Sequence, residues 1–324
     1  MTVAAIRLGV VGAGIMGRRV GAVAAASPRF EPVAVADSDP GRARALGSEL
    51  GAASYGSVRE LCAAGGLDAV YVGLPHRLHL EACLAAAEAG LHVLVDKPLC
   101  TTVAEADAIR DAAATSDRVW MVGFSYRYRA EWQLAQALVS TGALGRPYFA
   151  SDTSVEAYAA TPGWYWEEGG GALHLQSHHS FDRLAWILGS RPAEIACRVV
   201  RPPGSADVSA QIAARYESGV QAGIALSFGR SYDAAPRSLF VVQAERGMLE
   251  IDERRVLRVT TAEGTVEEDH GTDDWLRREL AAFAAAVDGS GAGYPGLAEG
   301  RAAVLAAAAA GEAAEQDRWV RPGA

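Results

Sequence analysis

The chain has 324 residues, half of them hydrophobic, and a formal net charge of −9. This length suits two domains, each able to bury a core without a disulfide or a metal. A nucleic-acid-binding protein would usually show a basic patch, and the sequence has no cluster of basic residues. We therefore expect small-molecule rather than nucleic-acid partners.

The cysteines and the apolar segments bear on location. Cys62, Cys83, Cys100 and Cys197 are scattered without a CxxC pair, which argues against a zinc site and is typical of reduced thiols. The first residues lack the pattern of a signal peptide, and no run of about 18 uncharged apolar residues is present. We expect a cytoplasmic protein that does not enter a membrane.

Residues 1–124 alternate strand and helix patterns. Ile6–Val11, 33–36, Ala69–Val72, 92–95 and 119–122 are short apolar runs, as expected for strands covered on both faces. Strands that alternate with helices predict an α/β fold, here a doubly wound parallel sheet of the Rossmann type. We expect this domain to bind a dinucleotide.

Residues 125–324 follow a different pattern, with longer strand-like segments between a few helices. The hairpin signal at 217–219 favours antiparallel pairing, and the pattern predicts an α+β domain with an open, mostly antiparallel sheet. We expect helices at Ala130–Ser140, Gly171–Leu188, Trp275–Val287 and 297–314. A sheet with helices on one face needs cover on the other, so we expect a homo-oligomer, a dimer or tetramer, formed through this sheet.

A glycine-rich motif, GAGIMG, follows the first strand and opens a helix. In such a motif Gly12 allows the tight turn, Gly14 lets the backbone approach a pyrophosphate, and Gly17 lets the helix pack closely. The N–H groups at the helix start would face the phosphates. We expect cofactor contacts from this turn, including those of Ile15 and Met16.

Asp37 ends the next strand, 20 residues after Gly17, where a carboxylate meets the ribose hydroxyls of the adenosine. A carboxylate there repels a 2′-phosphate. Arg42 and Arg44 are near enough in sequence to hold such a phosphate, but we expect both on the solvent face of the next helix. The sequence thus favours NAD as cofactor over NADP.

Lys97 is the single lysine among 30 basic residues. It follows a predicted strand at the carboxyl edge of the sheet, where ligands bind in open α/β folds. Hydride transfer from an alcohol needs a proton acceptor. A lysine desolvated beside a cationic nicotinamide can serve, whereas arginine stays charged. The alternative is a surface lysine beside a proline turn; we take Lys97 as the first catalytic candidate.

Several segments together resemble the glucose–fructose oxidoreductase, inositol dehydrogenase and rhizopine-catabolism (Gfo/Idh/MocA) family. Besides the glycine motif, residues 72–79 are similar to the family's "TPN…H" turn and 89–99 to its "AGKHVLCEKPLA". Residues 123–128 resemble "GFNRRF", 169–182 resemble "GGGxLxDxGxHxxD", and 245–251 match a common late strand. The likeness runs in order across nearly the whole chain.

The resemblance implies oxidation or reduction of a secondary alcohol on a sugar, amino sugar or cyclitol. It places the nicotinamide near the Lys97 loop and the 171–188 helix. We therefore expect Leu74, Pro75, His79 and Asp96 beside the cofactor, with Asp96 in place of the family's glutamate.

His179 is the second catalytic candidate. Family members often carry a carboxylate four residues before this histidine, and here that position is Leu175, so the usual Lys–Asp–His relay is incomplete. His179 could act with Lys97 alone, bind the substrate hydroxyl, or be a core histidine. Asp182 could orient His179 or brace helices.

Four further residues are candidates for substrate contact. Tyr126 and Arg127 adjoin the expected domain junction, and Trp164 could stack on a sugar face or simply pack in its loop. His178 shares metal-like spacing with His174 and Asp182, but the resemblance calls for no metal, and we expect substrate contact or packing.

Two alternatives to a dehydrogenase or ketoreductase remain open. One is an NAD-dependent glycosidase that uses transient oxidation, and the other is a non-catalytic dinucleotide sensor. The retained Lys97 argues against the sensor.

Overall fold

The computed structural model describes residues 4–157, 163–166, 170–229, 232–271, 274–291 and 293–323. The chain forms two compact units, Met1–Ser125 with Asp274–Arg301, and Tyr126–Asp273 with Ala302–Ala324. The expected second domain, 125–324, therefore differs from the second unit, because Asp274–Arg301 packs with the first. Gly169 of the predicted glycine run lies outside the described residues.

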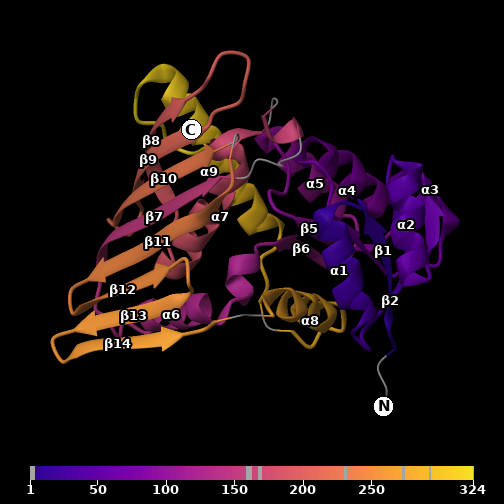
Figure 1. Ribbon diagram of the computed structural model, residues 1–324, viewed down its shortest axis with the longest axis horizontal. Coiled ribbons are helices and arrows are strands. Elements are labelled where there is room, and N and C mark those ends of the chain that lie inside the picture. The colour runs from indigo at the N-terminus through magenta and orange to yellow at the C-terminus, as the bar shows by residue number, and fades with distance from the viewer. Residues whose placement is uncertain are drawn as a thin grey trace. The chain divides into compact units, whose positions relative to one another are not determined.

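The first unit is built on a six-stranded parallel sheet in the order β3-β2-β1-β4-β5-β6 (Figure 1). Its strands are β1 (Ile6–Val11), β2 (Phe30–Ala36), β3 (Ala53–Tyr55), β4 (Ala69–Val72), β5 (His92–Asp96) and β6 (Trp120–Gly123). Its helices are α1 (Ile15–Ala25), α2 (Pro40–Leu50), α3 (Val58–Ala64), α4 (His79–Glu88), α5 (Val103–Ala113) and α8 (Trp275–Val287), with the short helix η1 (His76–Leu78).

The predicted parallel sheet is confirmed, and its strand order defines a binding edge. β1 has β2 on one side and β4 on the other, so the order reverses between β1 and β4. Every residue of β4 is buried, as expected for a strand covered on both faces. In open α/β sheets, ligands bind outside the carboxyl ends of the strands at this reversal.

The second unit contains an eight-stranded sheet in the order β14-β13-β12-β11-β7-β10-β9-β8, antiparallel except for β10 with β7. The strands are β7 (Pro147–Ala157), β8 (Pro192–Val200), β9 (Ser209–Tyr216), β10 (Gln221–Gly229), β11 (Ala234–Ala244), β12 (Gly247–Asp252), β13 (Val256–Thr261) and β14 (Gly264–Asp269). The helices are α6 (Ala130–Ser140), α7 (Gly171–Leu188) and α9 (Leu297–Gln316), whose first residues belong to the first unit. Two short helices, η2 (Ser125–Tyr128) and η3 (Gly163–Trp166), complete the set.

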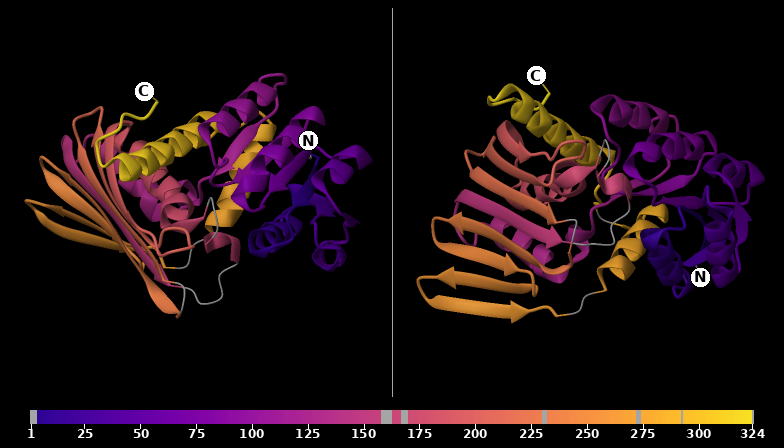
Figure 2. Two further views of the ribbon diagram at one scale, coloured as in Figure 1. Left: turned by 90° about the horizontal axis from the view of Figure 1, so that it is seen from above. Right: turned by 45° about the horizontal axis from the view of Figure 1, so that its top comes forward.

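The helices of the second unit cover one face of its sheet (Figure 2). Alternate residues of β9, such as Ile212 and Ala214, point into this core with α7. On the opposite face, Phe149, Val155 and Leu239 are 41%, 45% and 41% exposed. This sheet face therefore presents large apolar side chains without a covering helix from the described part of its own unit.

No helix in the described part of the chain is both long and apolar enough to cross a membrane.

Candidate active site

The glycine turn after β1 is shaped for a dinucleotide. Gly12 has φ +97°, and a Cβ there would lie 2.3 Å from the Gly73 carbonyl oxygen at the end of β4. A Cβ on Gly17 would lie 1.7 Å from the Gly12 carbonyl oxygen, so both positions require glycine. A Cβ on Gly14, in contrast, would meet no protein atom within 4 Å.

The open space at Gly14 lies at the N-terminus of α1. Gly14 is the N-cap residue, with no side-chain cap, and the first turn carries no acidic residue. The N–H groups of a helix start favour an anion, and an approaching pyrophosphate meets no side chain at Gly14. Ile15 beside it is 74% exposed and Met16 is half-buried. The residues present thus fit the phosphates of a dinucleotide.

Asp37 lies buried at the end of β2 and is fixed by four hydrogen bonds. Its Oδ2 accepts the Ala13 N–H at 2.9 Å, and its Oδ1 accepts the Asp39 N–H at 2.8 Å. The Nε and Nη2 of Arg42 donate to the same Oδ1 at 3.2 and 2.9 Å. Oδ2 therefore keeps room for one further donor, such as a ribose hydroxyl.

Arg42 lies on the exposed side of α2, as expected, and its guanidinium also contacts Asp37. The Asp39 side chain caps α2 by accepting the N–H groups of Gly41 and Arg42, which sets the first turn of this helix beside β2. The Arg42 side chain remains 55% exposed. A cation thus stands beside the carboxylate that was expected to select the cofactor.

Lys97 follows β5 at the same sheet edge, and its main chain is held by its neighbour. The Lys97 N–H donates to Asp96 Oδ1 at 2.8 Å. Tyr71 of β4 is buried, and its hydroxyl lies 3.5 Å from Asp96 Oδ2. Burial raises the pKa of Asp96, partly offset by the charge of Lys97, and burial raises that of Tyr71 as well. The Asp96 carboxylate, which is shorter than the family's glutamate, thus accepts a hydrogen bond from the backbone of the turn at Lys97.

His79 lies behind this turn and is fully buried. Its Nδ1 is 2.9 Å from the Pro98 carbonyl oxygen, and its Nε2 is 2.8 Å from the Leu74 carbonyl oxygen. Burial lowers the pKa of His79, and the carbonyl oxygens and the charge of Asp96 offset part of this effect because they raise the pKa. His79 was expected beside the cofactor, but its ring nitrogens are used by the two turns. Leu74 and Pro75 are half-buried in the turn that His79 holds.

In the second unit, α7 carries His179. The ring of His179 contacts the Tyr126 ring edge-on, with centroids 4.9 Å apart. The guanidinium groups of Arg183 and Arg129 lie 4.0 and 4.3 Å from the Tyr126 ring centroid. Leu175, one turn before His179, is 4% exposed and belongs to the buried side of the helix. Tyr126 is therefore fixed against His179 by cation–π contacts.

Asp182 forms a two-pronged ion pair with Arg127. The Nη2 of Arg127 donates to Asp182 Oδ1 at 2.6 Å, and its Nε lies 3.0 Å from Oδ2. The Arg127 side chain is 15% exposed and that of Asp182 is 2% exposed. Of the roles considered for Asp182, the contact with Arg127 supports a brace between α7 and the segment before α6.

Two other predicted substrate residues differ in exposure. His178 is almost fully buried, on the same helix as His179. Trp164 is half-buried in η3 and contacts the Tyr165 ring edge-on at 4.4 Å. Within the described residues, no three or more His, Cys, Asp or Glu side chains gather as a metal site would require.

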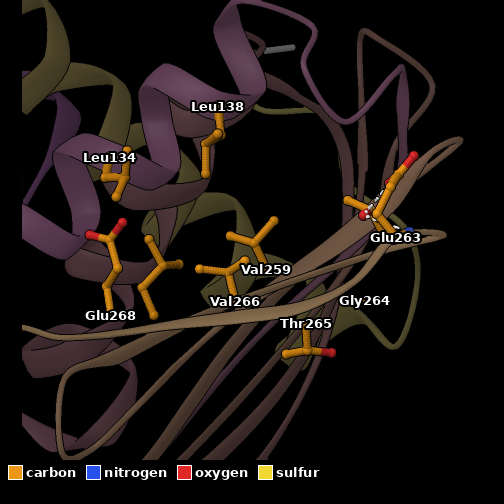
Figure 3. A pocket seen from close by; sticks show the side chains of 10 residues that line it. Leu134, Leu138, Val259, Glu263, Gly264, Thr265, Val266 and Glu268 are labelled. Carbon is orange, nitrogen blue, oxygen red and sulfur yellow. Dashed lines mark hydrogen bonds between the residues drawn. The ribbon is translucent and has the colours of Figure 1, made fainter.

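A cavity of about 370 Å³ lies between α6 and the β13–β14 hairpin of the second unit (Figure 3). Leu134 and Leu138 of α6 face Val259 and Val266 across it. Its lining is mostly apolar and includes none of the predicted site residues. We therefore assign it no part in the chemistry.

Sequence reasoning missed two parts of the site, Tyr71 and the Asp152–Arg183 pair. Arg183 Nη2 lies 2.5 Å from Asp152 Oδ2 with both side chains buried, and the Arg183 guanidinium lies over the Tyr126 ring. In the sequence, these residues stand out only as polar residues within apolar strand or helix patterns. Such a pattern does not identify the residue that each one contacts.

The fold and the open glycine turn define a dinucleotide-binding oxidoreductase. Residues 6–124 match the model of the oxidoreductase family with an NAD-binding Rossmann fold, and residues 132–250 match the GFO/IDH/MocA C-terminal domain. The chain belongs to the Gfo/Idh/MocA family, as its motifs predicted.

Two relatives and one solved structure illustrate the likeness. The dTDP-3,4-didehydro-2,6-dideoxy-alpha-D-glucose 3-reductase of Streptomyces violaceoruber is 31% identical over 322 residues, covering 95% of this chain and 92% of the relative. The D-xylose 1-dehydrogenase (NADP(+)) 2 of Haloferax volcanii is 29% identical, covering 86% and 88%. Levoglucosan dehydrogenase in complex with NADH and levoglucosan shares the fold, with a TM-score of 0.88 at 23% identity, covering 98% and 100%.

Proposed function

We propose that this oxidoreductase uses NAD to oxidise a secondary alcohol, or reduce the matching ketone, on a sugar, amino sugar or cyclitol. The observation that carries the proposal is that the open turn at Gly14, the carboxylate of Asp37 and the loop of Lys97 follow the carboxyl ends of strands in one parallel sheet. The relatives named above act on sugars, which supports this substrate class.

NAD, when bound, supplies the hydride acceptor. The chain's own residues bind the cofactor and the substrate, and they move the proton. The N–H groups at the start of α1 would hold the pyrophosphate, and Asp37 would accept a ribose hydroxyl. Lys97 takes the proton of the substrate hydroxyl, or returns it in the reverse direction. His179, held against Tyr126, binds the hydroxyl or assists the proton transfer.

The preference for NAD rests on the carboxylate of Asp37, which would repel a 2′-phosphate. Arg42 weakens this preference because it neutralises Asp37 and could hold a 2′-phosphate. One relative is named for NADP, so we propose a preference rather than strict exclusion.

The proposal extends to assembly and location. The apolar face with Phe149, Val155 and Leu239 fits a second copy of the chain, giving a dimer or tetramer. Four free cysteines fit a reducing cytoplasm.

The test is a screen of sugars, amino sugars and cyclitols with NAD and with NADP, followed by the absorbance of the reduced nicotinamide. Net reduction of NAD by one substrate class supports the proposal. Cleavage of a glycoside without net reduction would replace it with the transient-oxidation alternative. Dinucleotide binding without either reaction would favour the sensor.

A further inference from the structure

His79 links two turns of the first unit that the sequence separates. The Leu74 carbonyl follows β4 and the Pro98 carbonyl follows β5, and each lies within 2.9 Å of one nitrogen of the same buried ring. Because β4 and β5 are neighbours in the sheet, these turns lie side by side at its carboxyl edge. His79 is thus a bridge between them.

The Lys97 segment is held on both sides of its Cα. On one side, the Lys97 N–H donates to Asp96 Oδ1 at 2.8 Å. On the other, the carbonyl of the next residue, Pro98, meets His79 Nδ1 at 2.9 Å. Two short anchors around one residue fix the direction in which its side chain leaves the backbone.

We propose that His79 is a positioning residue for Lys97, acting through the carbonyl oxygen of Pro98. A carbonyl oxygen accepts and a neutral ring carries one N–H, so we assign that proton to Nδ1, where it donates to Pro98; the ring donates to Leu74 as well only when it is protonated. When His79 is lost, the turn keeps the Asp96 anchor but loses the other one, and the amine samples directions unsuited to proton transfer. This role rests on the proposed function, which makes Lys97 the proton acceptor.

Two substitutions separate the contacts of His79. His79→Asn places an amide N–H near the position of Nδ1, and so keeps a donor for Pro98. His79→Gln places its amide near the position of Nε2, and so keeps a donor for Leu74 alone. Both remove the ring from the same buried site, so their effects on packing are similar. A difference between them reports the Pro98 contact.

The single lysine of the chain makes the readout direct. Protein labelled with ¹³C at the lysine ε-carbon gives one resonance, whose titration follows the Lys97 amine without substrate or assignment. The measurement is made on the full-length protein with saturating NADH. The matched control is His92→Gln, at the opposite end of β5, where His92 Nδ1 accepts the Val119 N–H at 3.0 Å.

We expect His79→Gln to shift or broaden the Lys97 resonance and to lower turnover by about 10-fold, with NADH affinity within about 2-fold of the wild type. His79→Asn should restore most of the resonance position and most of the turnover. His92→Gln should leave the resonance in place. Equal effects of Asn and Gln, or the same shift in His92→Gln, would overturn the proposal. Because the resonance needs no turnover, failure to find a substrate would count against the proposed function alone.

Discussion

Asp37 and Arg42 form an ion pair in which two nitrogens of one guanidinium contact a single carboxylate oxygen, Oδ1. The other oxygen, Oδ2, is bound to the Ala13 N–H and can accept one ribose hydroxyl. In our proposal this pair sets the choice of cofactor, because a carboxylate favours NAD and a cation can hold the 2′-phosphate of NADP.

Asp37→Ser should weaken NAD binding by about 10-fold and strengthen NADP binding, because it removes the ribose acceptor and releases Arg42. Arg42→Ala should weaken NADP without changing NAD by more than about 2-fold. Fluorescence titrations with NADH and NADPH measure both affinities. Tighter NADPH than NADH binding in the wild type would contradict the assigned preference.

Most regular elements followed from local patterns, but the short edge strand β3 was not predicted. α7 spans Gly171–Leu188 as predicted, because a glycine with φ +84° begins it and Gly189 in the left-handed region ends it. The strand β14 was not predicted, since all its residues are exposed and no apolar alternation marks it. Its place in the sheet comes from pairing with β13.

Residues of the candidate site could be proposed from the sequence only where one residue type suits the chemistry. The glycines and Lys97 could be named from spacing and chemistry. The bond from His79 to Pro98 joins residues 19 apart, and no pattern shows that both nitrogens of this ring face carbonyl groups. The contact of the exposed Arg42 with Asp37 was not predicted, because helical periodicity alone does not say which side chain of α2 reaches the end of β2.

Leu239→Glu should dissociate the proposed oligomer, because it buries a charge in the apolar sheet face. Val266→Glu is the matched control, since Val266 is 64% exposed but lies on the edge strand β14, beside the cavity near α6. Light scattering coupled to size exclusion gives the mass of each variant. An unchanged mass for Leu239→Glu would show that copies meet elsewhere.

Leu175→Asp tests the absent family carboxylate. A carboxylate one turn before His179 can pair with it and should shift the pH dependence of turnover. Leu175 is buried, so the change should also lower the free energy of unfolding by roughly 3 kcal/mol. Leu175→Asn carries the same loss of packing without the charge. If both variants have the same pH profile of turnover, a carboxylate at position 175 does not interact with His179.

Stability should decline as the pH falls below 6.5. Burial lowers the pKa of His79, of His92, beside Arg118, and of His174 from 6.5 in the folded state. Below that value the unfolded chain binds protons that the folded chain does not, so unfolding is favoured, by at most about 1.4 kcal/mol per pH unit for each histidine. Urea unfolding at pH 7 and pH 5, with His92→Gln as the less acid-sensitive variant, measures this. Equal stability at both pH values would contradict it.

The proposed role of Lys97, transfer of the proton of the substrate hydroxyl, is tested by the steady-state kinetics of Lys97→Arg. Arginine keeps the charge but cannot release a proton, and the phosphate and ribose contacts lie elsewhere. We predict that turnover on the best substrate falls by roughly 10²-fold or more while NADH affinity stays near that of the wild type. Near-normal turnover of Lys97→Arg would contradict the claim.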